Sequence, residues 1–281
     1  KIYLPVILAL SLVNYFLRFL KWNHMLSAAG VSVERNLNIK VWLSGLAFSV
    51  SPGKIGEIIK SALLHQIAGI PASRTVPVVV ADRFSDVLAL VFLMVSGVFA
   101  YSYGLDVLAA GLVLTLIVFL LIRNRRILSF LAGKMLRRFV RTGIADSVNE
   151  MLEVQNRLFS PRFLAFPVIL SVLAWFAECA GLYFTLVGFG CEGAGIGIST
   201  FIYSLSTLAG AVSMLPGGLI ATEGSMAAMI GEAFGLATAA VALSATIIIR
   251  LCTLWFAVLI GLGTAPFLPN KSRMLDRGQL T

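Results

Sequence analysis

The stretch SPGKIGE at residues 51–57 returns in altered form as LPGGLIATEG at residues 215–224. Each stretch sets a Pro-Gly pair inside an apolar region and follows it with a carboxylate, Glu57 in the first and Glu223 in the second. Proline interrupts a helix because it lacks a backbone N–H. Broken helices at matching positions of two halves indicate a transport site at mid-membrane depth. The two stretches therefore bear on both the fold and the function.

The composition predicts a membrane protein. Of the 281 residues, 59% are hydrophobic and 12% are charged, whereas a soluble domain carries about 25% charged residues. Between residues 163 and 270 the only charged side chains are Glu178, Glu192, Glu223, Glu232 and Arg250. Apolar runs longer than roughly 18 residues are typical of bilayer-spanning helices. The expected fold class is therefore an all-α polytopic membrane protein.

Five full spans are expected, at residues 2–21, 75–101, 105–122, 163–189 and 237–267. Two more apolar intervals, residues 39–70 and 196–234, are each divided by a Pro-Gly pair into halves that are too short to cross a bilayer. Broken backbone at membrane depth is tolerated only where protein or a watery cavity covers it. We therefore expect each interval to form a re-entrant helix pair.

The basic residues set the expected orientation. Nine of the 22 lysines and arginines lie between Arg123 and Arg162, and cytoplasmic loops are enriched in basic residues. We expect residues 123–160 to form a basic amphipathic segment on the cytoplasmic face, with the tail at residues 271–281 on the same side. The membrane is expected to be the cytoplasmic membrane of a prokaryote. The net charge of +9 does not indicate nucleic-acid binding, because no recognition module accompanies it.

With this orientation, the two halves of the chain have opposite topology. Residues 1–122 and 161–270 are expected to form two inverted-topology repeats. Because the span at residues 105–122 precedes the second repeat, a further helix is expected upstream of Lys1. Landmarks at offsets of 160, 164 and 167 residues support the repeat: Arg18 with Glu178, Pro52 with Pro216, and Arg83 with Arg250.

Charged and helix-breaking residues inside these intervals form the expected substrate site. Ionisable groups at bilayer depth are costly and mark functional positions by default. A helix N-terminus attracts anions through its free N–H groups and its dipole, and Lys54 adds a positive charge to the first break. The expected substrate-binding residues are Pro52, Gly53, Lys54, Glu57, Lys60, Arg83, Pro216, Gly217, Gly218, Glu223 and Arg250.

Two arrangements of the intramembrane charges are open. The first consists of structural or coupling ion pairs that join Arg18 to Asp82 or Asp86, and Glu178 to Arg250. In the second, Arg83 and Arg250 both face a central cavity as ligands of a headgroup.

Three motifs together resemble the lysylphosphatidylglycerol synthase transmembrane family: SPGKIGEIIK at residues 51–60, ADRFSD at residues 81–86, and LPGG at residues 215–218 followed by Glu223 and Gly224. This family is the flippase-like domain attached to aminoacyl-phosphatidylglycerol synthases, and it also occurs as stand-alone membrane proteins. The resemblance implies a two-repeat fold with re-entrant helices, and movement of a phospholipid or lipid-linked substrate between leaflets. Aminoacyl transfer is not expected, because this sequence contains no soluble synthase domain.

The leading hypothesis is a membrane lipid translocase, whose cavity admits a headgroup while the acyl chains stay in the bilayer. Its expected partners are membrane lipids with anionic or zwitterionic headgroups. The alternative is a small-solute or organic-anion secondary transporter. A third hypothesis, an intramembrane lipid-modifying transferase, would depend on Glu57, Asp82 and Asp86. Neither enzymatic activity nor a cofactor is expected, because no catalytic motif is recognised and the only histidines, His24 and His65, are too few for a metal site.

Overall fold

The computed structural model describes residues 2–51, 56–98 and 144–269, with residues 109, 112, 113, 117 and 120 between the last two ranges. Several expectations lie outside this part of the chain, wholly or for the most part. They are the break residues Pro52, Gly53 and Lys54, the span at residues 105–122, the basic segment at residues 123–143, and the tail at residues 271–281.

Helices dominate the described residues, which contain no strand. The α-helices are α1 (Leu4–Ala28), α2 (Arg35–Gly45), α3 (Ile59–Ala68), α4 (Ala72–Val98), α7 (Ile144–Leu158), α8 (Pro161–Gly188), α9 (Ile196–Val212), α10 (Ala221–Ala228), α11 (Ala239–Arg250) and α12 (Phe256–Thr264). Short 3₁₀ turns occur at η1 (Leu46–Val50), η3 (Pro216–Gly218) and η6 (Ala265–Phe267), and π turns occur at η4 (Met229–Ala233) and η5 (Leu251–Trp255).

The chain is an all-α integral membrane protein. Within the described ranges, three helical segments are long and apolar enough to cross a membrane: Leu4–Ala28, Pro161–Gly188 and Ala239–Phe267. Helix α4 has 27 residues, which makes it about 40 Å long at 1.5 Å per residue. It is more polar than the other three because its first half carries Arg74, Asp82, Arg83 and Asp86.

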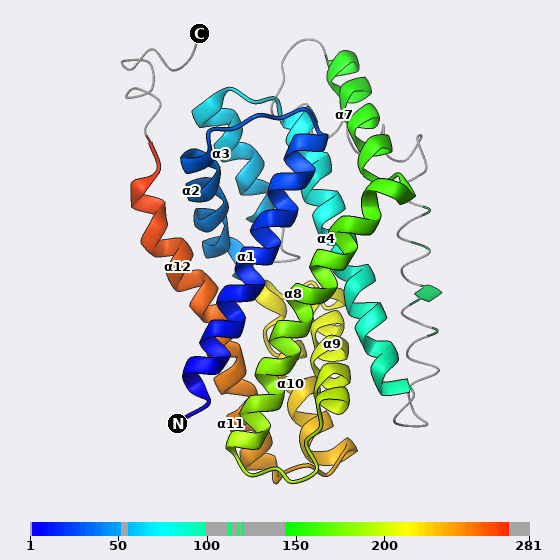
Figure 1. Cartoon of the computed structure of the whole chain (residues 1–281), viewed down its shortest axis with the longest axis vertical. Helices are drawn as coiled ribbons and strands as arrows, with labels where there is room; N and C mark the ends of the chain where they lie inside the picture. Colours follow the sequence, from blue (N-terminus) through cyan, green and yellow to red (C-terminus); the bar gives the residue numbers. More distant parts are fainter. Residues whose placement is uncertain are drawn as a thin grey trace.

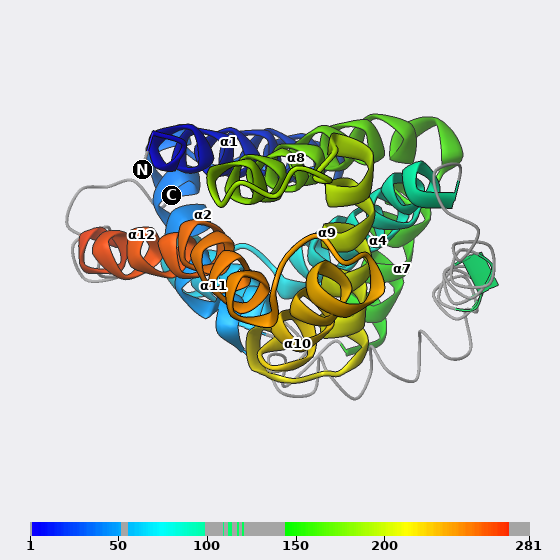
Figure 2. The same cartoon turned by 90° about the horizontal axis from the view of Figure 1, so that it is seen from below.

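Helices α1 and α8 run side by side in opposite directions. Figure 2 shows them together as one layer of the molecule, with α9, α10 and α11 in the other layer. Three contacts fix the direction: Tyr3 stacks on Phe184, the Asn14 amide donates to the carbonyl of Ala174 at 2.8 Å, and His24 stacks on Phe163. Because these contacts extend over the length of both helices, the α1–α8 pair is a continuous interface.

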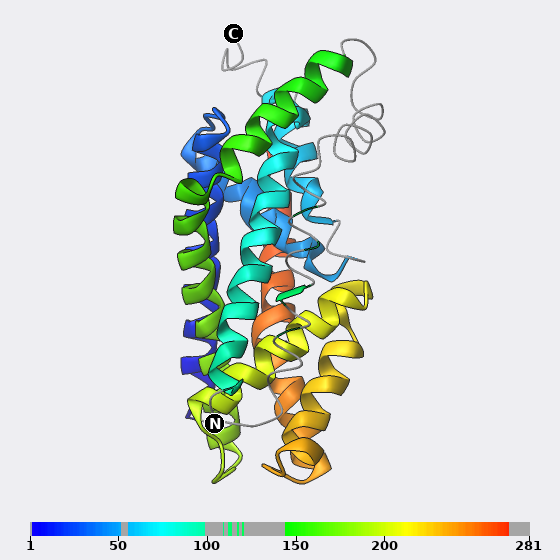
Figure 3. The same ribbon diagram turned by 90° about the vertical axis from the view of Figure 1, so that its right-hand side faces the viewer.

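Two broken segments lie at opposite ends of this pair. The first consists of α2, η1 and α3, beside the upper part of α1, and the second consists of α9, η3 and α10, in the lower half (Figure 1). Figure 3 shows α9 running from the lower end of α8 across to the opposite side of the molecule, where α10 lies. Helix α4 runs downward after the first segment, whereas α11 and α12 run upward after the second (Figure 1).

The tips of the two broken segments meet. Val50 ends η1 and Gly217 lies in η3, and a Cβ atom added to Gly217 would lie 3.2 Å from the Cα of Val50. It would also lie 3.3 Å from a methyl group of Leu254 in η5. A residue without a side chain is therefore needed at position 217 for this contact.

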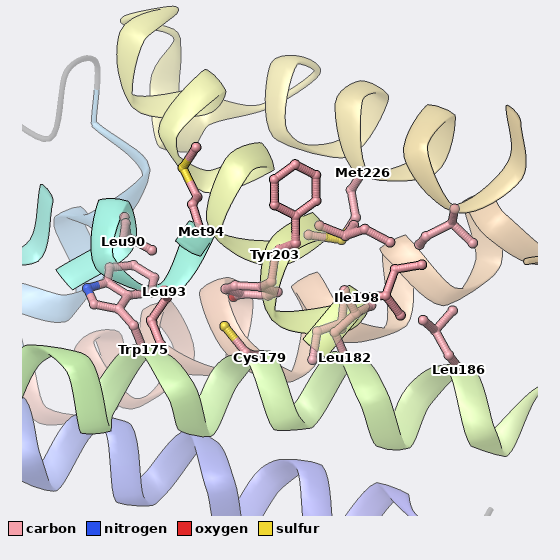
Figure 4. Close-up of a cluster of buried hydrophobic side chains, with 14 of the residues drawn as sticks. Leu90, Leu93, Met94, Trp175, Cys179, Leu182, Leu186, Ile198, Tyr203 and Met226 are labelled. Atoms are coloured by element: carbon pink, nitrogen blue, oxygen red, sulfur yellow. The ribbon is translucent and has the colours of Figure 1, made fainter. Parts of the chain in front are cut away.

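Each broken segment packs on its own hydrophobic cluster. The lower cluster joins α4, α8, α9 and α10 through Leu90, Leu93, Met94, Trp175, Cys179, Leu182, Leu186, Ile198, Tyr203 and Met226 (Figure 4). The upper cluster includes Trp22 and Met25 of α1, both fully buried, with residues of α2, α3 and α4. Close packing of this kind resists deformation, so the clusters hold the polar residues between them in fixed positions.

Candidate functional site

A cavity of about 220 Å³ lies between the two broken segments. Ser49 of η1 lines it from one side, and Gly217 and Gly218 of η3 line it from the other. Its charged lining residues come from both halves of the chain: Arg18, Glu57, Arg83, Asp86, Glu178 and Arg250. The expected site residues thus converge on one internal space, although Lys60, Asp82, Pro216 and Glu223 are not among the described residues of its wall.

In the first half, Glu57 is the meeting point of three basic side chains. The carboxylate lies 3.0 Å from Nη2 of Arg83, 3.4 Å from Nζ of Lys60 and 3.7 Å from Nη2 of Arg18. Glu57 is only 4% exposed, so its carboxylate is largely shielded from bulk solvent. Lys60 also lies over the ring of Trp22, at 4.9 Å from the ring centroid. Lys60 thus contacts Glu57 but is not among the described residues of the cavity wall.

Arg83 lies at the edge of the same cluster and contacts three carboxylates. Besides Glu57, its Nη2 atom lies 2.5 Å from Asp82 and 3.0 Å from Asp86. Arg18 lies 3.6 Å from Asp86, which is one of the two acids that the sequence analysis paired with it. Arg18 and Arg83 are therefore ion-paired and also line the cavity.

Lys21 is a central residue that the sequence analysis did not include in the site. That analysis ended the first span at Lys21, but α1 continues to Ala28 and the lysine side chain is fully buried. Its ammonium group lies 2.6 Å from Asp86, 2.8 Å from Asp82 and 2.8 Å from the hydroxyl of Ser171. The helix continues through this charge because two carboxylates compensate it. The sequence signal that could have identified Lys21 was its position one helical turn after Arg18.

In the second half, Arg250 forms its ion pair with Glu223, a partner that the sequence analysis did not assign to it. The Nε–Oε1 distance is 2.5 Å, and the Nη2 atom donates to the carbonyl of Gly217 at 2.7 Å. Glu223 occupies the first turn of α10, which packs against α11. Glu178, the partner expected from sequence, accepts a hydrogen bond from Tyr203 at 2.6 Å. Arg250 therefore binds both the acid and the backbone of the break.

The second break is a left-handed turn. Gly217 and Gly218 have φ values of 61° and 68°, which glycine adopts without strain. Met214 and Ile220 also have positive φ values, of 56° and 71°, and a β-branched residue in this region is a genuine outlier. The helix after the break begins at Ala221, so the turn is longer than the simple kink that Pro216 alone would produce.

A π turn follows Arg250 directly. Residues Leu251–Trp255 form η5 between α11 and α12, and such turns often occur at functional sites because they free backbone groups from the helical ladder. Here the Tyr15 hydroxyl of α1 donates to the carbonyl of Thr253 at 2.5 Å. Thr253 lines the cavity, so this bond ties the wall of the cavity to α1.

The comparison with protein families identifies the chain. The family model of the lysylphosphatidylglycerol synthase TM region matches residues 1–261. The chain belongs to this family. The match to the lysylphosphatidylglycerol synthase TM region covers both broken segments of this chain and every charged residue described in the cavity wall. Neither the curated proteins nor the solved structures gave a match.

Proposed function

We propose that the protein is a membrane lipid translocase that moves a phospholipid or lipid-linked headgroup between leaflets. The main support is the pair of matching ion pairs beside the cavity. Arg83 contacts Glu57 at 3.0 Å, and Arg250 contacts Glu223 at 2.5 Å. Each glutamate follows a break and each arginine belongs to the next long helix. Both arginines line the same internal space.

We infer from this correspondence that the two halves are inverted-topology repeats with re-entrant helix pairs. In this arrangement α1 corresponds to α8, the two broken segments correspond to each other, and α4 corresponds to α11 with α12. Transporters built in this way carry their substrate site where the broken helices of the two repeats meet. We place the end that holds α7 on the cytoplasmic side, because the basic run at residues 123–141 precedes this helix.

The proposed step is an exchange of partners at the arginines. A headgroup phosphate entering the cavity accepts hydrogen bonds from Arg83 or Arg250 and replaces a carboxylate in that role. Guanidinium groups suit phosphate because they donate two parallel hydrogen bonds. Rocking of one repeat against the other then exposes the phosphate to the opposite leaflet. This movement is passive or ion-coupled in our proposal.

The surroundings of the second break favour a lipid over a water-soluble solute. Leu215 lines the cavity and is also 40% exposed. Next to it, Val212, Met214 and Ile220 are large apolar residues with exposed fractions of 60% or more. An exposed apolar patch beside a polar cavity is suited to acyl chains, which remain in the bilayer while the headgroup enters. We therefore favour membrane lipids as substrates over small organic anions.

Transport also accounts for the acids better than catalysis does. Glu57, Asp82 and Asp86 are the residues on which a transferase would depend, and all three are engaged in ion pairs with basic side chains. A general base or nucleophile needs a free lone pair directed at the substrate. We therefore propose a transport role without a chemical step.

A liposome assay tests the proposal. The purified protein is reconstituted with phospholipids that carry a fluorophore on one acyl chain, and leaflet exchange is followed by quenching of the outer leaflet. We expect faster exchange than in protein-free liposomes, and loss of this acceleration in Arg83→Gln. Absence of acceleration for every phospholipid and lipid-linked sugar would refute the proposal. Uptake of a soluble organic phosphate in its place would support the small-solute alternative.

A further inference from the structure

Arg18 is held in the cavity wall differently from the other two arginines described there. Nη2 of Arg83 lies within 3.0 Å of three carboxylates, and Nε of Arg250 lies 2.5 Å from a fourth. The carboxylates nearest to Arg18 belong to Asp86 and Glu57, at 3.6 Å and 3.7 Å. Both distances exceed the length of about 2.7–3.2 Å of an ordinary N–H···O hydrogen bond. Arg18 is thus attracted to two acids without donating a hydrogen bond of ordinary length to either.

Trp175 supports the guanidinium group of Arg18 instead. The central carbon of this group lies over the indole ring, 5.6 Å from the ring centroid, which is within the range of about 6 Å for a cation–π contact. Trp175 is 4% exposed and belongs to the lower hydrophobic cluster (Figure 4). A cation–π contact is an attraction between a charge and the face of a ring. It therefore holds Arg18 in place and leaves its hydrogen-bond donors for other partners.

The cavity gives a ligand access to these donors. The Arg18 side chain is 14% exposed and lines the same internal space as Trp175. Among the described residues, the buried polar atoms that lack a hydrogen-bond partner include Nε of Arg83 but no atom of Arg18. Since Arg18 makes no ordinary hydrogen bond to a carboxylate either, its donors open on the cavity.

We propose that Arg18 is the residue that first binds the phosphate of the headgroup, and that Trp175 positions its guanidinium group for this contact. The inference rests on the translocase function proposed above. A guanidinium group donates two parallel hydrogen bonds to a phosphate, and Arg18 does so without breaking a hydrogen bond to a carboxylate. Arg83 and Arg250 have to exchange a carboxylate for the phosphate, so they bind it in a later step.

A matched pair of ligands tests the role of Arg18. Dihexanoylphosphatidylglycerol and dihexanoylglycerol share their acyl chains, but only the first carries a phosphate. Each is titrated by calorimetry into the purified protein in detergent. Arg18→Gln should weaken binding of the phospholipid by about tenfold or more, as expected for the loss of hydrogen bonds to a charged group, and should leave binding of dihexanoylglycerol unchanged. Equal losses for both ligands, or no loss for the phospholipid, would overturn the inference.

A second variant keeps the positive charge at this position. Arg18→Lys retains a cation beside Asp86 and Glu57 but cannot donate two parallel hydrogen bonds from one planar group. Its affinity for the phospholipid should lie between that of the unmodified protein and that of Arg18→Gln. Arg35→Gln is the matched control, because it removes an arginine at an exposed position of α2. Unchanged affinity in Arg18→Lys would contradict the role of the guanidinium group.

The effect of Trp175 should depend on Arg18, because the tryptophan acts through the arginine. Trp175→Leu should weaken phospholipid binding several-fold in the unmodified protein and have no further effect in Arg18→Gln. Trp175→Phe retains a ring but is a weaker cation–π partner than indole, so its affinity should fall between those of the unmodified protein and Trp175→Leu. Additive losses in the double variant would show that Trp175 does not position Arg18.

Inorganic phosphate distinguishes a lipid headgroup from a free anion as the ligand. We expect it to bind more weakly than the phospholipid, and to lose affinity in Arg18→Gln as the phospholipid does. Inorganic phosphate that binds as tightly as the phospholipid would support the site at Arg18 and refute the lipid as substrate.

Leaflet exchange in liposomes separates this inference from the proposed function. Phospholipid binding that depends on Arg18, without any exchange between leaflets, would support the phosphate site and refute the translocase. Exchange at the unmodified rate in Arg18→Gln would support the translocase and refute the role of Arg18.

Discussion

Arg250 holds Glu223 and the second break at the same time. Its Nε atom lies 2.5 Å from Oε1 of Glu223, and its Nη2 atom donates to the carbonyl of Gly217 at 2.7 Å. In the first half, Arg83 makes the matching contact with Glu57 at 3.0 Å. An arginine can do this because its planar group donates in two directions at once. The same side chains thus shape the cavity and supply its cations.

Replacing Arg250 should distinguish the effect of its charge on lipid exchange from the effect of its hydrogen-bond geometry. Arg250→Gln should slow lipid exchange by about tenfold or more, as expected for the loss of hydrogen bonds to a charged group. Arg250→Lys keeps the charge, but a lysine cannot bind Glu223 and the carbonyl of Gly217 with two separate N–H groups of a planar guanidinium. Its exchange rate should therefore lie between that of the unmodified protein and that of Arg250→Gln. Arg35→Gln, at an exposed position in α2, is the control. Full activity in Arg250→Gln would exclude a role in transport.

Removal of Lys21 should destabilise the protein. Lys21→Met removes the closest cation of Asp86 and one of the two cations that contact Asp82, and breaking a buried ion pair costs about 3–5 kcal/mol. We expect a lower thermal unfolding temperature in detergent, and partial recovery in Lys21→Met combined with Asp82→Asn. Lys40→Met serves as the control because Lys40 is exposed on α2. An unfolding temperature equal to that of the unmodified protein would show that Lys21 is not required for stability.

The second break should not tolerate a side chain at Gly218. Its φ value is 68°, and an added Cβ would lie 3.1 Å from the Cα of Gly210. Gly218→Ala should therefore lower the stability by more than about 1 kcal/mol and reduce exchange. Gly224→Ala is the matched control, because a Cβ at that helical position meets nothing within 4 Å. Equal unfolding temperatures for the two variants would mean that the turn accommodates the added Cβ without loss of stability, which would contradict the prediction.

Docking of α7 should depend on pH through Glu150. This residue accepts hydrogen bonds from Ser73 and Arg74 at the start of α4. Burial works to raise the pKa of Glu150, but these hydrogen bonds outweigh it and hold the pKa below its ordinary value of 4.5. A lowered folded-state pKa means that the contact stabilises the protein above the unfolded-state pKa and is lost as the pH falls through the folded-state pKa.

The measurement compares thermal unfolding of the unmodified protein with that of Glu150→Gln at pH values from about 7 down to below 4.5, the ordinary pKa of the carboxyl group. The unmodified protein should unfold at the higher temperature near pH 7, and the difference should shrink as the pH falls below 4.5. Glu153→Gln controls for the loss of another acid from the same helix. A difference between the proteins that persists in acid would rule out the carboxylate contact as its cause.

Long apolar runs predicted the helices well. The interval at residues 163–189 corresponds to Pro161–Gly188, and the interval at residues 237–267 corresponds to Ala239–Phe267. The two intervals with a Pro-Gly pair contain short helices separated by turns. The length of an apolar run and the position of a proline are local features of the sequence. They therefore predict where helices lie along the chain without knowledge of the tertiary packing.

Ion-pair partners were harder to predict, because they depend on how distant helices pack. Lys21 resembled a residue at the end of a span, and only the approach of α4 and α8 shows that it is compensated. Glu223 has no basic neighbour in sequence, and its contact with Arg250 requires the turn that directs α10 against α11. The π turn after Arg250 has no signal in the apolar pattern.

The contact between Val50 and Gly217 joins the tips of the two broken segments. A Cβ atom on Gly217 would lie 3.2 Å from the Cα of Val50 there, whereas α1 and α8 contact each other from Tyr3 to His24. If the proposed rocking motion conserves the long α1–α8 interface, the two tips must move apart. The α1–α8 pair would then be the hinge of this motion, and the two tips would form its gate.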